Sequence, residues 1–216
     1  GTYSVSGLSA AAAQSLIQAL VFTPTTNQVA VGSDTATTFE ISVDDGTAAA
    51  VLDTVTVVTA TSVNDAPTAV AITAEAIDEN TDTTAAVTVG TLSTTDADLN
   101  DTFTYTFTTT GGGGTDNASF AISGATLQVK AGVTLDFETK PSYDVEVTTT
   151  DLTGAAYVKA LTVTLNDTND APIIASTTTA AIGDNTTSTL FSAVTIGDQD
   201  ANETVDLLIT QQLAGG

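Results

Sequence analysis

Asn64-Asp65-Ala66-Pro67 recurs 105 residues later as Asn169-Asp170-Ala171-Pro172. Two further pairs of segments follow in the same order: Ala76-Ile77-Asp78-Glu79-Asn80 with Ala181-Ile182-Gly183-Asp184-Asn185, and Asp96-Ala97-Asp98 with Asp198-Gln199-Asp200. Three matches in one order indicate an internal repeat, and the spacing is the size of one β-sandwich domain.

The repeat divides the chain into one complete unit and two partial ones. We expect a whole domain over 64–172, the second half of a domain over 1–63 and the first half of a domain over 173–216. The two halves together are close to the middle unit in length, so the 216 residues correspond to one period of a two-domain repeat. We expect the half 173–216 to be completed by residues 1–63 of the next copy, in one longer polypeptide or between subunits, and we favour the former.

Composition excludes several functions. The chain carries 26 Asp plus Glu against 3 Lys plus Arg, a net charge of -23, which would repel nucleic acid. It has no Cys and no His, so thiolate and imidazole metal ligands, a cysteine nucleophile and a Ser-His-Asp triad are absent, and we expect no enzymatic activity. A mean hydropathy of +0.22 indicates a packed core, while no stretch is long enough to insert into a membrane.

The residue types predict an all-β fold. About a fifth of the chain is Thr, and Val, Ala and Ile are also abundant, a population that suits pleated strands. Short alternating runs predict seven strands in the middle unit: 69–72, 86–89, 102–108, 119–122, 126–129, 143–149 and 158–165. Seven strands in about 100 residues are typical of an immunoglobulin-like sandwich. One helix is expected over 9–20, capped by Ser9 and packing through Leu16, Ile17 and Leu20.

Acidic segments recur through the middle unit. They are Asp78-Glu79-Asn80, Asp96-Ala97-Asp98, Leu135-Asp136-Phe137-Glu138, Asp151-Leu152-Thr153-Gly154 and Asp167-Thr168-Asn169-Asp170-Ala171-Pro172. In this order they resemble a cadherin repeat, of the kind found in extracellular adhesins and surface filament proteins of bacteria or archaea. The resemblance implies tandem Greek-key sandwiches whose acidic segments converge on the domain junctions and bind calcium. Asp78, Phe137 and Ala171 depart from the cadherin pattern, but none of these changes removes a ligand carboxylate.

For the junction after the middle unit, the resemblance implies a full set of calcium ligands. The set comprises Glu79, Asp136, Glu138, Asp167, Asn169 through its carbonyl, Asp170, Asp198 and Asp200, with Asp44 or Asp45 from the next copy. The chemistry agrees, because Ca²⁺ takes six to eight oxygen ligands and clustered carboxylates repel one another without a cation. The alternative is that these acids are solvated turn residues, a common role of Asp and Asn.

The other junction is poorer in acids. Ser62 stands where Asp167 stands in the second linker, and residues 1–63 contain no segment like Leu135-Asp136-Phe137-Glu138. The expected ligands there are Asn64, Asp65, Asp96, Asp98, Asp151 and Asp184. We expect this junction to hold one ion, more weakly than the junction at 167–172.

These features favour a calcium-stiffened structural module of an extracellular filament, stalk or sheath. Its expected partners are neighbouring copies of itself, with no nucleic acid and no membrane insertion. The alternative is a cell-surface adhesin repeat that binds a partner or carbohydrate directly, which exposed aromatic residues clustered on one face would support. A third possibility is an appendage of an enzyme whose catalytic domain lies elsewhere.

Overall fold

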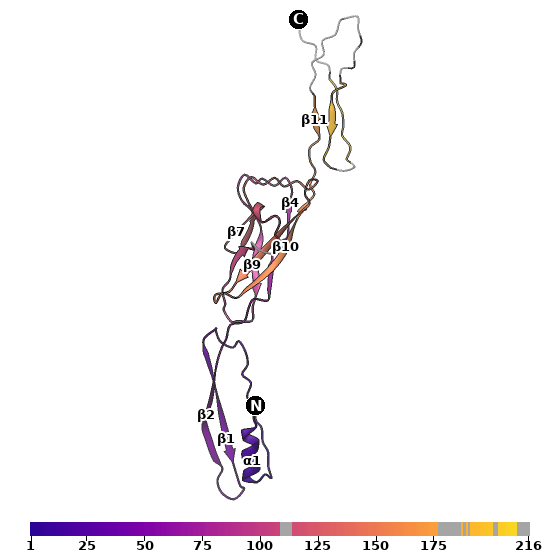
Figure 1. Cartoon of the computed structure of the whole chain (residues 1–216). Helices are drawn as coiled ribbons and strands as arrows, with labels where there is room; N and C mark the ends of the chain where they lie inside the picture. Colours follow the sequence, from indigo (N-terminus) through magenta and orange to yellow (C-terminus); the bar gives the residue numbers. More distant parts are fainter. Residues whose placement is uncertain (109–113, 177–186, 188, 190, 201–202, 211–216) are drawn as a thin grey trace. The chain divides into compact units, whose positions relative to one another are not determined.

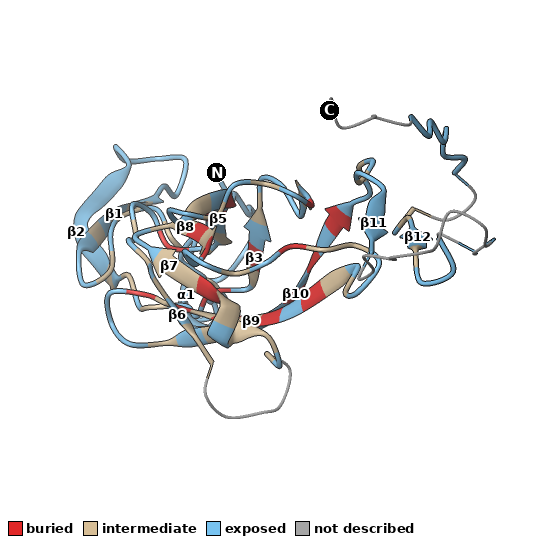
Figure 2. Cartoon of the chain, turned by 90° about the horizontal axis from the view of Figure 1, so that it is seen from above, coloured by how far each residue is buried: buried red, intermediate tan, exposed pale blue. Residues whose placement is uncertain are grey.

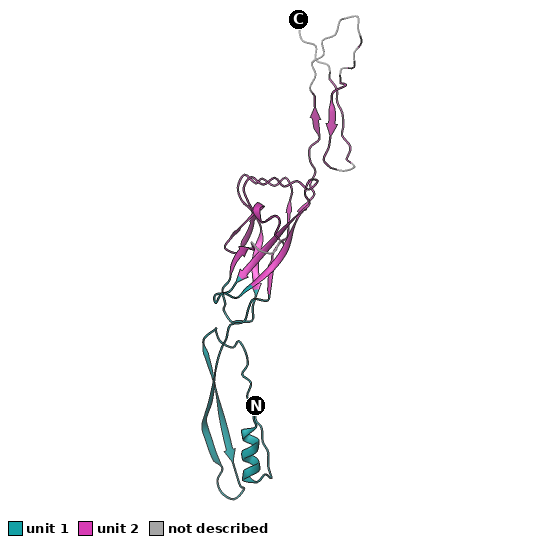
Figure 3. Ribbon diagram, in the orientation of Figure 1, with its two compact units in different colours: residues 1–68, 95–103, 150–156 teal, residues 69–94, 104–149, 157–216 magenta. Residues whose placement is uncertain are grey.

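The computed structural model describes residues 1–108, 114–176, 187, 189, 191–200 and 203–210. The chain divides into two compact units, coloured separately in Figure 3. The first unit comprises Gly1–Thr68, Thr95–Phe103 and Thr150–Ala156, and the second comprises Ala69–Thr94, Thr104–Thr149 and Tyr157–Gly216. No helix in the described part of the chain is long and apolar enough to cross a membrane.

The second unit contains a β-sandwich (Figure 1). One sheet has the order β4-β10-β9-β6 and the other β3-β5-β8-β7. The strands are β3 (Ala69–Ile72), β4 (Ala76–Asp78), β5 (Val87–Thr95), β6 (Thr104–Phe107), β7 (Phe120–Ser123), β8 (Thr126–Val129), β9 (Ser142–Thr150) and β10 (Ala156–Asn166), with a 3-10 turn at Asn117–Ser119. The predicted all-β class with one short helix is confirmed.

One strand of the sandwich was not predicted. β4 is three residues long and pairs in parallel with the end of β10, with Ala76 opposite Thr164 and Asp78 opposite Asn166. Three residues are too few to show an alternating pattern, so only tertiary pairing defines this strand. It leads directly into Glu79.

The sandwich core follows the period of two that a half-buried strand requires. Along β9 the side chains of Tyr143, Val145 and Val147 are buried, while alternate positions are more exposed. β10 contributes a matching row of buried residues, which appears as red bands in Figure 2. Phe120 packs edge-on against Tyr143, with 5.6 Å between ring centroids. The sandwich therefore has a continuous packed core between its two sheets.

Asp116 ties a loop of the sandwich to β9. Its carboxylate accepts hydrogen bonds from the Lys140 ammonium at 2.6 Å and the Asp144 amide at 2.8 Å. Although burial raises the pKa of Asp116, the hydrogen bonds from Lys140 and Asp144 and the lysine charge together lower it below its usual value. A lone aspartate of this kind resembles a solvated turn residue in the sequence, but here it has a structural role.

We expect Asp116→Asn to destabilise the sandwich in a pH-dependent way. Because the pKa is lowered on folding, the folded chain binds fewer protons, so the carboxylate stabilises it above the ordinary aspartate pKa of about 3.9. This contribution is lost as the pH falls through the lower pKa of the folded state. Urea unfolding at pH 7 should show a loss on the order of 1 kcal/mol, and at pH 3 a smaller one. An equal loss at both pH values would contradict this assignment.

The first unit holds the helix and a hairpin. α1 (Ala10–Gln18) begins after Ser9, whose hydroxyl accepts from the Ala12 amide, as predicted. β1 (Asp34–Val43) and β2 (Val51–Thr61) pair antiparallel. Contrary to our expectation of a packing element, α1 buries none of its residues, and Ile17 and Leu20 are exposed. The reason is that the described part of the first unit has one two-stranded sheet and no second layer to bury the helix. Phe39 of β1 packs against Phe22, which lies outside the helix.

A second hairpin lies in the second unit. β11 (Ile173–Ala175) and β12 (Thr195–Gly197) pair antiparallel, with Ile173 opposite Gly197. The residues that follow β12 include Asp198 and Asp200. This hairpin therefore positions two of the predicted calcium ligands.

Candidate metal centres

Five acidic residues of the first unit and one asparagine gather in one place, which we call the first cluster: Asn64, Asp65, Asp96, Asp98, Asp101 and Asp151. They come from the linker after β2 and from two loops that follow β5 and β9 in the chain. One carboxylate oxygen from each of Asp96, Asp101 and Asp151 lies within 4.8 Å of the other two. Three negative charges at this spacing repel one another, and a cation bound between them would offset that repulsion.

Hydrogen bonds from backbone amides and from the Asn64 side chain hold the first cluster in place. The Asp65 amide donates to Asp98 Oδ2 at 2.7 Å, and the Asn64 side chain donates to Asp151 Oδ2 at 2.9 Å. The other oxygen of Asp151 accepts from the amides of Thr153, Gly154 and Ala155. The Asn64 hydrogen bond, together with those from Thr153 and the backbone, lowers the pKa of Asp151, so it is a carboxylate at neutral pH.

Four oxygens of the first cluster are buried without a hydrogen-bond donor. They are Asn64 Oδ1, Asp96 Oδ2, Asp98 Oδ1 and Asp101 Oδ2. Asp98 and Asp151 are only 8% and 5% exposed, so water reaches this region poorly. A buried acceptor without a partner is costly, and these oxygens are the hard ligands that Ca²⁺ binds. The residues present therefore fit a calcium ion.

The second unit holds a larger group, which we call the second cluster: Glu79, Glu138, Asp167, Asp170, Asp198, Asp200 and Glu203. Its carboxylates form three overlapping triads with ligand atoms within 4.8 Å of one another: Glu79-Glu138-Asp170, Glu138-Asp167-Asp200 and Asp198-Asp200-Glu203. A hollow of about 410 Å³ lies among them, and Asn169 also lines it. Glu138 and Asp200 each belong to two triads, so they could bridge neighbouring ions, and the cluster has room for more than one.

Like charges oppose one another in the second cluster. Burial, followed by the charges of Asp200, Glu79 and Asp170, raises the pKa of Asp167. The pKa of Glu138 is also raised: its own backbone amide pulls it down, but burial and the charges of Glu79, Asp167 and Asp200 together outweigh that effect. A bound cation would remove this repulsion.

Glu79 connects two of the acidic segments. It is 2% exposed, and its two carboxylate oxygens accept from the Phe137 amide at 2.6 Å and the Thr168 amide at 2.7 Å. One carboxylate thus ties the Leu135-Asp136-Phe137-Glu138 segment to the linker that begins at Asp167. This connection explains why a buried charge follows β4.

The two clusters are built in the same way. The Asp170 amide donates to Asp200 Oδ2 at 2.6 Å, as the Asp65 amide does to Asp98. In both linkers the asparagine side chain donates to the next backbone carbonyl at 2.6 Å, from Asn64 to Asp65 and from Asn169 to Asp170. The sequence repeat is therefore also a repeat of side-chain geometry.

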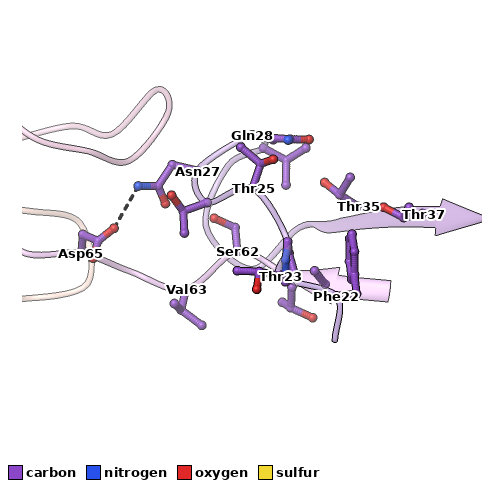
Figure 4. A pocket seen from close by; sticks show the side chains of 15 residues that line it. Phe22, Thr23, Thr25, Asn27, Gln28, Thr35, Thr37, Ser62, Val63 and Asp65 are labelled. Carbon is purple, nitrogen blue, oxygen red and sulfur yellow. Dashed lines mark hydrogen bonds between the residues drawn. The ribbon is translucent and has the colours of Figure 1, made fainter. Parts of the chain in front are cut away.

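Each linker aspartate also receives an asparagine side chain from another loop. Asn80 Nδ2 donates to Asp170 Oδ1 at 2.6 Å, and Asn27 Nδ2 donates to Asp65 Oδ2 at 2.9 Å (Figure 4). Both asparagines have a left-handed backbone, with φ of 55° and 56°, which Asn tolerates better than most residues. The sequence did not point to Asn27, because its surroundings do not match those of Asn80.

Several predicted ligands lie apart from the carboxylate triads. Asp136 accepts from the Thr139 amide at 2.7 Å and from the Gln199 side chain at 3.4 Å. Asp44 and Asp45 hold the turn between β1 and β2, where they accept from the Gly46 and Thr47 amides. Asp184 lies outside the described residues.

Two members of the clusters were missed from the sequence, Asp101 and Glu203. The signal was available, because the match between the repeats continues beyond Asp98 and Asp200. Asp96-Ala97-Asp98-Leu99-Asn100-Asp101-Thr102 aligns with Asp198-Gln199-Asp200-Ala201-Asn202-Glu203-Thr204. An acid thus stands at the same position in both copies, and each acid joins a triad.

No family model matches the chain, and no curated protein matches it. Among solved structures, the chain is similar to a human protocadherin-24 fragment, EC1-2, at 26% identity over 51% of this chain and 48% of that one, with a TM-score of 0.40. It is also similar to the protocadherin gamma B2 cadherin domains 1-5, at 19% identity over 79% of this chain and 33% of that one, with a TM-score of 0.45. The human desmocollin-1 ectodomain matches at 16% identity over 65% of this chain and 29% of that one, with a TM-score of 0.37. The chain spans less than half the length of each of these structures.

Proposed function

We propose that this chain is a calcium-binding structural repeat module of an extracellular filament, stalk or sheath. The observation that carries the proposal is the set of four buried oxygens without a donor in the first cluster. Oxygen-only ligands in flexible loops suit Ca²⁺ better than transition metals, which favour nitrogen and sulfur. The bound ion would supply the positive charge, while backbone amides fix the carboxylates of Asp98, Asp151 and Asp200.

The proposed role is mechanical. Each cluster gathers residues from separate segments of the chain, so a bound ion would link a linker to the loops beside it. Without the ion, carboxylate repulsion would push these segments apart. Small-angle X-ray scattering should therefore give a different radius of gyration in calcium and in chelator. An identical scattering curve in both conditions would contradict stiffening.

We expect the two clusters to differ in affinity. The second cluster has seven carboxylates and the first has five, and calcium affinity rises with ligand charge. Asp170→Ala should therefore abolish the tighter calcium step in a calorimetric titration, whereas Asp65→Ala should weaken only the looser one. The two positions are matched controls, because each aspartate accepts from one asparagine side chain. Equal losses in the two variants, or loss of the tighter step in Asp65→Ala, would overturn this ranking.

A further inference from the structure

The β1-β2 hairpin corresponds to the β9-β10 pair of the sandwich. The linker repeat at a spacing of 105 residues places β2 opposite β10, with Ala60 matching Leu165. Thr35 pairs with Ala60, and the Leu165 amide donates to the Pro141 carbonyl, so Thr35 matches Pro141. The same alignment sets Phe39-Glu40-Ile41 against Val145-Glu146-Val147. Both hairpins thus alternate apolar and polar residues in the same way, with Glu40 and Glu146 between two apolar residues.

The surroundings of the two hairpins differ. In the sandwich, β9 and β10 lie between β6 and β4, so both outer edges are paired. Within the described residues, β1 and β2 form a two-stranded sheet and pair only with each other. Val58 of β2 is 36% exposed, whereas its counterpart Val163 in β10 is 1% exposed. The hairpin therefore has the residues of a sandwich sheet without the strands that would cover it.

A hollow lies beside the end of β2. It measures about 450 Å³ and is lined by residues 22–29, by Thr35 and Thr37, and by residues 60–63 and Asp65 (Figure 4). The hydroxyls of Thr35 and Ser62 are buried there without a hydrogen-bond partner. In the sandwich, the matching end of β10 carries β4 beside it. Within the described residues, the end of β2 therefore lacks the neighbouring strand that the end of β10 has.

The complementary strands lie near the other end of the chain. Ile173 pairs with Gly197, the register found in the sandwich, where the Thr68 amide donates to the Thr95 carbonyl. The segment after β12 extends the match, with Asp206–Ile209 aligned to β6. Leu207 and Ile209 stand at the positions of Tyr105 and Phe107, which pack against the sandwich core. In this chain Leu207 is 63% exposed.

We propose that the β11-β12 hairpin and residues 203–210 of one copy of this chain dock on the β1-β2 hairpin of a second copy and form a β-sandwich with it. Segment 206–209 would pair with the free edge of β1, as β6 pairs with β9, and would insert Leu207 and Ile209 into the new core. A second copy is the fitting occupant because the two hairpins correspond to strands of different sheets, β1-β2 to β9 and β10 of one sheet and β11-β12 to β3 and β5 of the other. The inference rests on strand pairing, so it holds whether or not the acidic clusters bind calcium.

The mass of the whole chain in solution tests the docking. Sedimentation velocity should show a mass that rises above 21.6 kDa with concentration. Leu207→Asp should raise the concentration needed for assembly by at least tenfold. Leu208→Asp is the matched control, because Leu208 is 85% exposed and aligns with the outward-facing Thr106, so it should assemble like the parent. A monomer at every concentration, or equal effects of the two substitutions, would overturn the proposal.

Disulfide trapping tests the register, since the chain has no native cysteine. In the sandwich, the Thr108 and Thr148 hydroxyls lie 2.7 Å apart, and their counterparts are Thr210 and Ser42. A Ser42→Cys chain mixed with a Thr210→Cys chain should give a disulfide dimer. Thr59→Cys on β2, one strand further away, should give much less with Thr210→Cys. Equal disulfide yields from these two mixtures would overturn the register. A chain that carries both Ser42→Cys and Thr210→Cys tests closure within one copy, because a monomer with an internal disulfide would overturn docking between copies.

Discussion

Removing calcium should lower the melting temperature of the chain by roughly 5–10 °C. A ligand that binds only the folded state stabilises it by about 2.7 kcal/mol at a hundredfold excess over Kd. Here the effect has a structural basis, because carboxylates that repel one another in both clusters would be neutralised by the ion. Differential scanning calorimetry in calcium and in chelator measures the change.

The control for this result is magnesium at the same ionic strength. Mg²⁺ needs a tighter octahedral site and gives up its waters reluctantly, so it should restore less of the stability than Ca²⁺. Salt alone screens exposed charges but acts weakly on the buried ones. The same melting temperature in calcium, magnesium and chelator would contradict the assignment of these clusters to calcium.

Glu79→Ala should destabilise the sandwich by about 2–4 kcal/mol and also weaken calcium binding at the second cluster. The substitution leaves the partly buried Phe137 and Thr168 amides without their acceptor. It also removes one ligand from the triad with Glu138 and Asp170. Urea unfolding in chelator measures the first effect, and a calcium titration measures the second.

Two further variants separate these effects. Glu75→Ala removes an exposed carboxylate four residues away and should change neither stability nor calcium affinity much. Glu79→Gln keeps an oxygen for one amide but loses the charge. It should therefore retain part of the stability of the parent chain, while its calcium affinity should be as low as that of Glu79→Ala. If Glu79→Ala matched Glu75→Ala in both measurements, Glu79 would have neither role.

Features with long sequence patterns were predicted well. The alternating apolar residues of β9 and β10 extend over nine and eleven residues, so their strand character is visible without tertiary information. The helix was predicted from its Ser9 cap and the Ala-rich run that follows. The repeated Asn-Asp-Ala-Pro segments predict both linkers, and the two linkers make the same hydrogen bonds in the structure.

Features that depend on a few long-range contacts were not predicted. β4 exists because three residues pair with the end of β10. Asp116 and Asn27 are single polar residues whose partners, Lys140 and Asp65, are distant in the sequence. The local sequence around each of these polar residues predicts only a solvated turn residue. Asp101 and Glu203 are different, because a longer comparison of the two repeats identifies both.

The most direct test of calcium binding is to count the bound ions. Equilibrium dialysis of the chain against calcium up to ~1 mM, the upper range for extracellular modules, should give at least one bound ion for each cluster. Asp96→Asn/Asp101→Asn should lose the ion of the first cluster and keep those of the second. No bound calcium at this concentration, or an unchanged count in the double variant, would contradict the account.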